Sequence, residues 1–232
     1  MTVKLFRTKA NSFLLNPTVL ICIFMTFIFL QILWAEGGGL ILLLITLIVL
    51  WSTKWDWPYF GISTPYSRNM VMVAIFYAIG LFIIMDIALI PIIEMRFGET
   101  DLSDFDDLQG DIVVFLIFSL FMWFTAAFGE ELVYRGFFIK RIAIMLGDNQ
   151  GSWVIAAFIN SFVFGLGHIY MGMSGALQAG LAGLLLSFVF IYNKQNLMMC
   201  MLMHGFYDMI WATILYLDKV QAVKALILET FH

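Results

Sequence analysis

Long apolar runs constrain the fold of this chain more than any other feature. About 20 apolar residues in a helix cross the ~30 Å hydrocarbon core of a bilayer, and a helix satisfies its own backbone hydrogen bonds there. Candidate runs lie at about 15–35, 40–53, 70–94, 112–139, 153–171, 174–193 and 196–216. The second is short for a span. The pattern predicts an all-α, polytopic transmembrane helical bundle of about seven spans.

Composition supports one integral membrane domain over residues 1–232. The chain is 62% hydrophobic and only 12% charged, whereas charged residues make up about 25% of a soluble domain. No internal repeat is present. After Asp218, apolar residues recur at Val220, Val223, Ile227 and Phe231. That helical spacing predicts a short C-terminal interfacial helix.

The basic residues predict an orientation with the N-terminus in the cytoplasm. On that side lie Lys4, Arg7, Lys9, Lys54, Arg68, Lys140, Arg141 and Lys194, against Arg96, Lys219 and Lys224 outside. This bias follows the positive-inside rule. The lysines and arginines are too few and too scattered for nucleic-acid binding. The acidic segment 98–111 is expected to be a solvated outer loop, because its carboxylates lack calcium-loop spacing.

Ionisable side chains within the apolar runs are the candidates for function. Such groups cost several kcal/mol at membrane depth unless they are paired, and they commonly mark working sites. The stretch "FGEELVYRGFF" (128–138) holds two glutamates and an arginine. The other polar residues within runs are Asp86, Asn160, His168, His204 and Asp208. Asp86 has no histidine or carboxylate at helical spacing, so we expect a structural role for it.

Helical spacing assigns partners to the two glutamates and to one histidine. Glu131 and Arg135 are four residues apart and can form an ion pair, which leaves Glu130 without a local cation. His204 and Asp208 are also four apart, so the carboxylate can accept an imidazole N–H and fix the tautomer. The alternative for Glu130, Glu131 and Arg135 together is an internal ion-pair staple.

A third helical stripe joins Asn160, Phe164 and His168. The neighbouring Gly165 and Gly167 allow a helix or a substrate backbone to approach closely. Each histidine taken alone is more typical of a packing residue than of a catalyst. Taken together, however, the three helices supply a base, two imidazoles and an acid, and this combination favours catalysis.

Three ordered motifs resemble a known family. "EELVYR" (130–135) fits EExxxR, "FGLGH" (164–168) fits FxxxH, and "HGFYD" (204–208) fits HxxxN/D. In this order they resemble the CAAX protease and bacteriocin-processing family of intramembrane proteases, which is related to the Ras-converting type II CAAX prenyl endopeptidases. The resemblance covers about residues 112–216, which would form the catalytic core.

The resemblance implies a helical bundle around a water-filled cavity. Glu130 and His168 would activate the attacking water, and His204 with the residue at 208 would stabilise the oxyanion. Supporting or substrate-orienting roles would go to Glu131, Arg135 and Asn160. Members commonly carry Asn at the last motif position. An ionised Asp208 cannot donate a hydrogen bond, so we expect it to orient or charge His204, which alone donates.

The residues leave two possibilities for a metal. Glu130, His168 and His204 could ligate zinc with an open position for water, but HExxH spacing is absent. The resemblance points to water activated by glutamate, so no cofactor is expected and zinc is the alternative. Cys22 and Cys200 lie within apolar runs without a CxxC or Cys/His cluster, so neither a disulfide nor a cysteine-based zinc framework is expected.

These observations predict an intramembrane endopeptidase acting on a membrane-associated peptide or protein. The first alternative is a non-catalytic bacteriocin-immunity or scaffold protein of the same fold. A proton-coupled transporter would also use intramembrane carboxylates and histidines, but it predicts repeated halves. The small size and the lack of an ER-retention tail favour a bacterial plasma membrane. Whether the substrate is prenylated, and the oligomeric state, stay open.

Overall fold

The computed structural model describes residues 12–13, 16–33, 35–62 and 67–230. Within these residues all regular structure is helical, as the sequence predicts. The α-helices are α2 (Pro17–Leu33), α3 (Ala35–Ser52), α4 (Trp57–Phe60), α5 (Arg68–Phe82), α6 (Ile90–Phe97), α7 (Ile112–Met122), α8 (Lys140–Met145), α9 (Gln150–Leu166), α10 (Gly172–Tyr192), α11 (Leu197–Tyr216) and α12 (Val220–Thr230). Three π-helical segments lie within longer helices: η1 (Ile83–Leu89), η3 (Trp123–Glu130) and η4 (Leu132–Ile139). Two 3₁₀ segments, η2 (Ser103–Leu108) and η5 (Ile169–Met171), lie in connections.

Four continuous helices in the described residues are long and apolar enough to cross a bilayer, by length and composition. They are Arg68–Phe97, Ile112–Met145, Ile169–Tyr192 and Leu197–Tyr216. The prediction of seven spans is therefore wrong. α2 and α9 have 17 residues each, about 26 Å at 1.5 Å per residue, which is less than the hydrocarbon core requires.

The ends of the shorter helices explain this correction. α9 ends at Leu166, because the chain then turns through Gly167 and His168 into η5, whereas the sequence predicted that span to reach 171. The expected turn at residues 37–39 is absent, since these glycines lie within α3. Apolar character alone therefore overestimated how far these helices extend.

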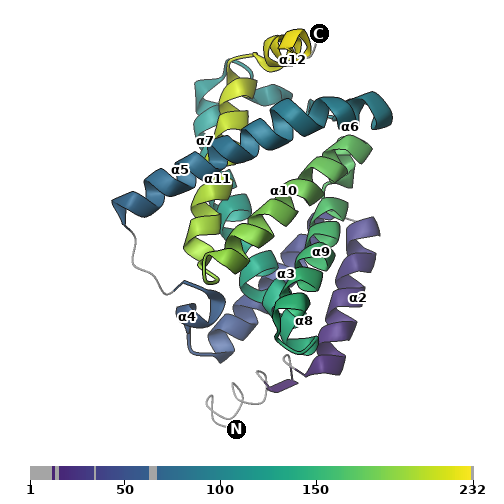
Figure 1. Ribbon diagram of the computed structural model, residues 1–232, viewed down its shortest axis with the longest axis vertical. Coiled ribbons are helices and arrows are strands. Elements are labelled where there is room, and N and C mark those ends of the chain that lie inside the picture. The colour runs from purple at the N-terminus through teal and green to yellow at the C-terminus, as the bar shows by residue number, and fades with distance from the viewer. Residues whose placement is uncertain (1–11, 14–15, 34, 63–66, 231–232) are drawn as a thin grey trace.

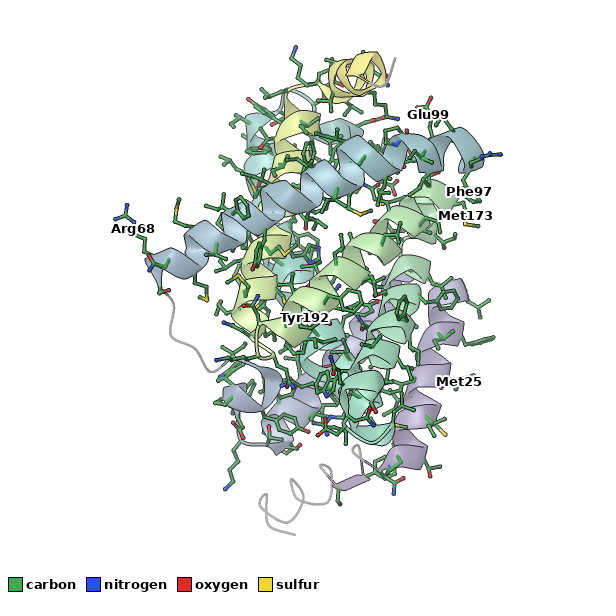
Figure 2. All side chains as sticks on the ribbon, viewed as in Figure 1. Met25, Arg68, Phe97, Glu99, Met173 and Tyr192 are labelled. Atoms are coloured by element: carbon green, nitrogen blue, oxygen red, sulfur yellow. The ribbon has the colours of Figure 1, made fainter. Side chains whose placement is uncertain are left out.

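The long helices cross and pack against one another in the middle of the molecule (Figure 1). α5, η1 and α6 form one rod that crosses α10 and α11, and Figure 2 labels Arg68 and Phe97 at its two ends. α9 packs along α10, and α11 contacts both α5 and α7. α12 lies at one end of the molecule, and α4 and α8 lie at the other.

The outer surface carries large apolar side chains, as a lipid-facing surface requires. Met25, Phe76, Ile117, Phe124 and Phe162 are each more than 60% exposed, and Figure 2 shows Met25 on the outer side of α2. A water-soluble monomer rarely exposes apolar surface on this scale. Together with the four candidate spans, this surface indicates an integral membrane protein.

α12 lies at the end of the bundle where the predicted C-terminal helix was expected. Its Lys224 Nζ lies 3.1 Å from Glu94 Oε2 and 3.2 Å from Glu99 Oε2. Partial burial alone would lower the pKa of Lys224, but hydrogen bonds and charge from the two glutamates raise it above its usual value. The placement of this helix at a membrane interface stays a prediction.

Several residues behind the predicted orientation and tail lie outside the described part of the chain. They are Lys4, Arg7, Lys9 and Phe231. The orientation with a cytoplasmic N-terminus therefore stays a prediction.

Candidate active site

The two glutamates lie on the helix that runs from Ile112 to Met145. Asp111 caps its start by accepting hydrogen bonds from the N–H groups of Val113 and Val114. The α-helical pattern then widens into the π-helical segments η3 and η4, which meet at Glu131. Such π-helical turns occur frequently at functional sites. Here they coincide with the residues that the motif "EELVYR" singled out.

Glu131 is completely buried, and one of its carboxylate oxygens contacts both an arginine and a histidine. Its Oε1 accepts from Arg135 Nη1 at 2.6 Å and lies 2.8 Å from His204 Nδ1. The predicted ion pair between Glu131 and Arg135 is therefore present. The contact with His204 was not expected, because the two residues are 73 positions apart.

Arg135 is itself fully buried and is held by more than the glutamate. Its Nη2 donates to the carbonyl oxygen of Gly183 at 2.9 Å, and its Cζ lies 4.9 Å from the centre of the Phe164 ring. A side chain at Gly183 would press against that ring and against the guanidinium. Glycine on α10 therefore makes room for the arginine that compensates the buried Glu131.

His204 and Asp208 lie on α11, which Asn196 caps by accepting from the N–H of Met199 at 3.3 Å. His204 Nε2 lies 3.5 Å from Asp208 Oδ2, farther than Nδ1 is from Glu131. The nearer acceptor for the ring is thus Glu131, whereas helical spacing had suggested Asp208. Since each ring nitrogen has a carboxylate beside it, an imidazolium here would have an acceptor for both N–H groups.

His168 lies just beyond the end of α9, and its tautomer follows from one contact. Its Nδ1 is 2.9 Å from the carbonyl oxygen of Phe164. Because a carbonyl oxygen only accepts, Nδ1 carries the proton and the neutral ring keeps a lone pair on Nε2. The close approach expected at Gly165 is present, since a Cβ there would lie 2.6 Å from the carbonyl oxygen of Ala176 on α10.

A cavity of about 700 Å³ brings the four predicted catalytic residues to one space. Its lining includes Glu130, His168, His204 and Asp208. Glu130 is half-buried, and within the described residues its carboxylate forms no hydrogen bond or ion pair. Helical spacing describes each helix separately and did not require these side chains to meet.

The remainder of the lining is mainly apolar and extends from Glu130 to α12. Its walls include Ile90, Met95, Phe105, Phe118, Phe121, Met122, Phe164, Leu186 and Leu215. Gln221 and Lys224 of α12 lie at the far part of the same cavity. The lining is therefore mainly apolar, with polar and charged side chains both at the motif residues and near α12.

Asn160 is placed away from this cavity. It is completely buried, and its Nδ2 donates to Ser187 Oγ of α10 at 3.1 Å, while Ser187 Oγ donates to the carbonyl oxygen of Gly183. Gly183 is also the acceptor for Arg135. Asn160 therefore supports the packing of α9 on α10 beside the arginine and does not line the space that a substrate would occupy.

The comparison with protein families decides the family to which this region belongs. Residues 112–210 match the family described as type II CAAX prenyl endopeptidase Rce1-like. This region is an Rce1-like CAAX protease domain. The resemblance inferred from the three motifs is thus confirmed. Neither the curated proteins nor the solved structures yielded a match.

The Rce1-like domain begins with α7 and ends within α11. It contains the four predicted catalytic residues that line the cavity. It does not include the α5–η1–α6 rod, although Asp86 and Glu94 of that rod also line the cavity. The cavity wall is therefore completed by a helix outside the matched region.

Sequence reasoning missed several polar residues of this wall. Gln178, Tyr207 and Trp211 all line the cavity and surround Asp86. Each is uncharged, so none stood out from an apolar run. Asp86 itself was noticed, but its partners lie on other helices and not at helical spacing.

The zinc alternative was tested against the geometry of the domain. Among the described residues, no three His, Cys, Asp or Glu side chains lie close enough together to hold a metal ion. The Nδ1 atoms of His168 and His204 lie beside Phe164 O and Glu131 Oε1, so only their Nε2 atoms could serve as ligands, and these do not converge with Glu130 on one point. The described arrangement does not fit a Glu130–His168–His204 zinc site, and no reaction step is derived through a metal here.

Proposed function

We propose that the protein is an intramembrane endopeptidase that hydrolyses a peptide bond of a membrane-associated peptide or protein. Membership of the CAAX protease family makes a protease function the expected one. The observation that carries the proposal is the convergence of Glu130, His168, His204 and Asp208 on one largely apolar cavity. The substrate and the role of each residue are part of the proposal.

In the proposed reaction, Glu130 and His168 activate a water molecule. The Glu130 carboxylate is unpaired, and His168 Nε2 is an acceptor, so both can take a proton or a hydrogen bond from water. The water oxygen bonds to the scissile carbonyl carbon while its proton passes to Glu130. Glu130 then gives that proton to the leaving amine as the C–N bond breaks, which balances the hydrolysis.

His204 is the proposed donor to the oxyanion. Its Nδ1 donates to Glu131, so Nε2 donates as well only when the ring is doubly protonated, a form in which both N–H groups have carboxylate neighbours. A donor fixed in an apolar cavity stabilises developing charge more than water does. Glu131 and Arg135 act through His204, which they hold in place.

The test uses purified, folded protein and internally quenched peptides, one set ending in a farnesylated Cys-aliphatic-aliphatic-X sequence and one matched set without the lipid. Glu130→Ala and His204→Ala are each expected to abolish cleavage. Asp104→Asn, a change in the exposed loop segment η2, serves as the matched control and should cleave as the wild type does.

Two results would overturn the proposal. Cleavage that survives both alanine changes would show that these residues do not carry the reaction. A cellular phenotype that survives Glu130→Ala while cleavage is lost would favour the scaffold or immunity function. The membrane is proposed to be a bacterial plasma membrane, with the bilayer itself and a peptide or protein as the partners.

A further inference from the structure

A second polar cluster lies on the cavity wall and belongs to none of the three family motifs. Asp86 of η1 is only 3% exposed, and it meets Gln178 of α10 and Trp211 of α11. Asp86 lies in the middle of the π-helical segment η1. Glu131 is also next to π-helical structure, at the point where η3 and η4 meet. All three side chains face the cavity that contains Glu130.

The contacts of Asp86 determine which way the Gln178 amide points. Asp86 Oδ1 accepts from Trp211 Nε1 at 3.0 Å, and it lies 2.6 Å from Gln178 Nε2. An indole N–H can only donate, so Oδ1 accepts from Trp211, and an ionised Asp86 carboxylate has no proton to donate to a neighbour. The group of Gln178 that faces this carboxylate is the amide NH₂, which donates to Oδ1.

The second hydrogen of the same nitrogen also has a partner. Gln178 Nε2 donates to the hydroxyl oxygen of Tyr207 at 3.4 Å. Both amide hydrogens are thus directed toward the wall. Among the described residues the amide oxygen Oε1 has no hydrogen-bond partner, and it is not enclosed. It is a fixed acceptor on the surface of a mostly apolar cavity.

We propose that Gln178 Oε1 accepts a hydrogen bond from a main-chain N–H of the bound peptide, with Asp86 as the residue that positions the amide. The inference rests on the proposed peptidase function and adds a substrate-anchoring residue to it. A peptide in an apolar cavity must find acceptors for its N–H groups, because each unsatisfied group costs free energy. Every peptide offers such a donor whatever its side chains.

The test replaces single N–H groups of the substrate with ester oxygens, at each non-scissile position in turn. In the wild type, the ester substitution at one position is expected to lower kcat/KM about three- to tenfold, as the loss of one hydrogen bond does. In Gln178→Met that same substitution should have no effect. Gln178→Met itself should raise KM for the amide peptide and leave kcat within about twofold, because the contact serves binding.

Asp86 is tested as a positioning residue with a conservative variant. Asp86→Asn keeps an oxygen that accepts from Trp211 and Gln178, so the ester penalty should remain. Asp86→Leu removes that acceptor and frees the amide to rotate, so the penalty should shrink. If the cluster were merely structural, Asp86→Leu would lower thermal stability. The protein that stays folded would then show the same ratio of kcat/KM for the ester and amide peptides as the wild type.

The inference is separated from the peptidase proposal by a binding measurement. The same amide and ester peptides, labelled with a fluorophore, are titrated into Glu130→Gln and into Glu130→Gln/Gln178→Met. An affinity preference for one N–H that disappears in the double variant supports the inference, even if no peptide is cleaved by the wild type. The inference is overturned if no position shows an ester penalty in either assay, or if the full penalty persists without Gln178.

Discussion

At the scale of single residues, the adjacent glutamates of "EELVYR" have different surroundings. Glu131 is fully buried and bonded to Arg135 and His204, whereas Glu130 is half-buried at the cavity without a described partner. A buried ion pair is costly to break, because one partner alone leaves an uncompensated charge. Glu131 therefore bears on stability, and Glu130 is free for chemistry.

This difference predicts opposite effects of two alanine changes. Glu131→Ala should destabilise the folded protein by roughly 3–5 kcal/mol, since it leaves the buried Arg135 without its carboxylate. Glu130→Ala should change stability by less than about 1 kcal/mol, because no described contact is lost. Thermal unfolding of both variants in the same detergent checks this. Equal losses in the two variants would contradict the account.

Asp208 gives a prediction about turnover. Asp208→Asn should lower kcat roughly tenfold with little change in KM, because one negative charge beside His204 Nε2 is lost. Steady-state kinetics on a single peptide measures the two constants. Cleavage by Asp208→Asn that equals or exceeds that of the wild type would rule out a required carboxylate at this position.

The sequence predicted these residues but only part of their contacts. The pair Glu131–Arg135 follows from helical spacing, and the motifs identified His168 and His204. The contact of Glu131 with His204 joins helices that are 73 positions apart, and that of Asp86 with Gln178 spans 92 positions. Periodicity describes one helix at a time, so it does not show which side chains meet across helices.

At the scale of helices, glycines determine how closely the motif segments approach. Gly205 follows His204 on α11, and a Cβ at this position would clash with the Trp123 ring of η3. The contact holds α11 against the segment that ends in Glu130. In contrast, a Cβ at Gly80 of α5 meets nothing within 4 Å.

Gly205→Ala should therefore destabilise the protein by about 1–3 kcal/mol, the usual cost of overpacking, and should lower cleavage as well. Gly80→Ala is the matched control and should be neutral or stabilising by up to about 1 kcal/mol, since alanine is the better helix former. Unfolding temperatures and kcat/KM of the two variants test the pair. A neutral Gly205→Ala would show that η3 and α11 do not pack as described.

The number of spans also belongs to this scale. Hydropathy located each of the four long helices to within six residues at either end. It did not anticipate that α9 would end before His168, where the backbone leaves the α-helical region at φ −107° and ψ 14°. That is a feature of backbone geometry that apolar character does not record.

At the scale of the whole molecule, the matched family region and the preceding rod share one cavity. The Rce1-like domain supplies Glu130, His168, His204 and Asp208, and the rod supplies Asp86. The cavity continues to α12, where Lys224 contacts Glu94 and Glu99. The wall of this cavity therefore combines the matched family region with helices on either side of it in the chain.

The proposed mechanism uses side chains and water, which predicts insensitivity to chelators. Incubation of the purified protein with EDTA and 1,10-phenanthroline should leave kcat/KM unchanged, and elemental analysis should find far less than one zinc per chain. Loss of cleavage on chelation, with recovery when zinc is added, would instead establish the alternative Glu130–His168–His204 site in a rearranged conformation.

The central claim is that Glu130 activates water for peptide hydrolysis in this cavity, and one measurement tests it most directly. Glu130→Gln keeps the size of the side chain and removes the base. The account predicts that this variant binds a cleavable peptide with an affinity within about threefold of the wild type, while its single-turnover cleavage rate falls by at least about 10²-fold. Cleavage at a rate close to that of the wild type, with binding retained, would contradict the account.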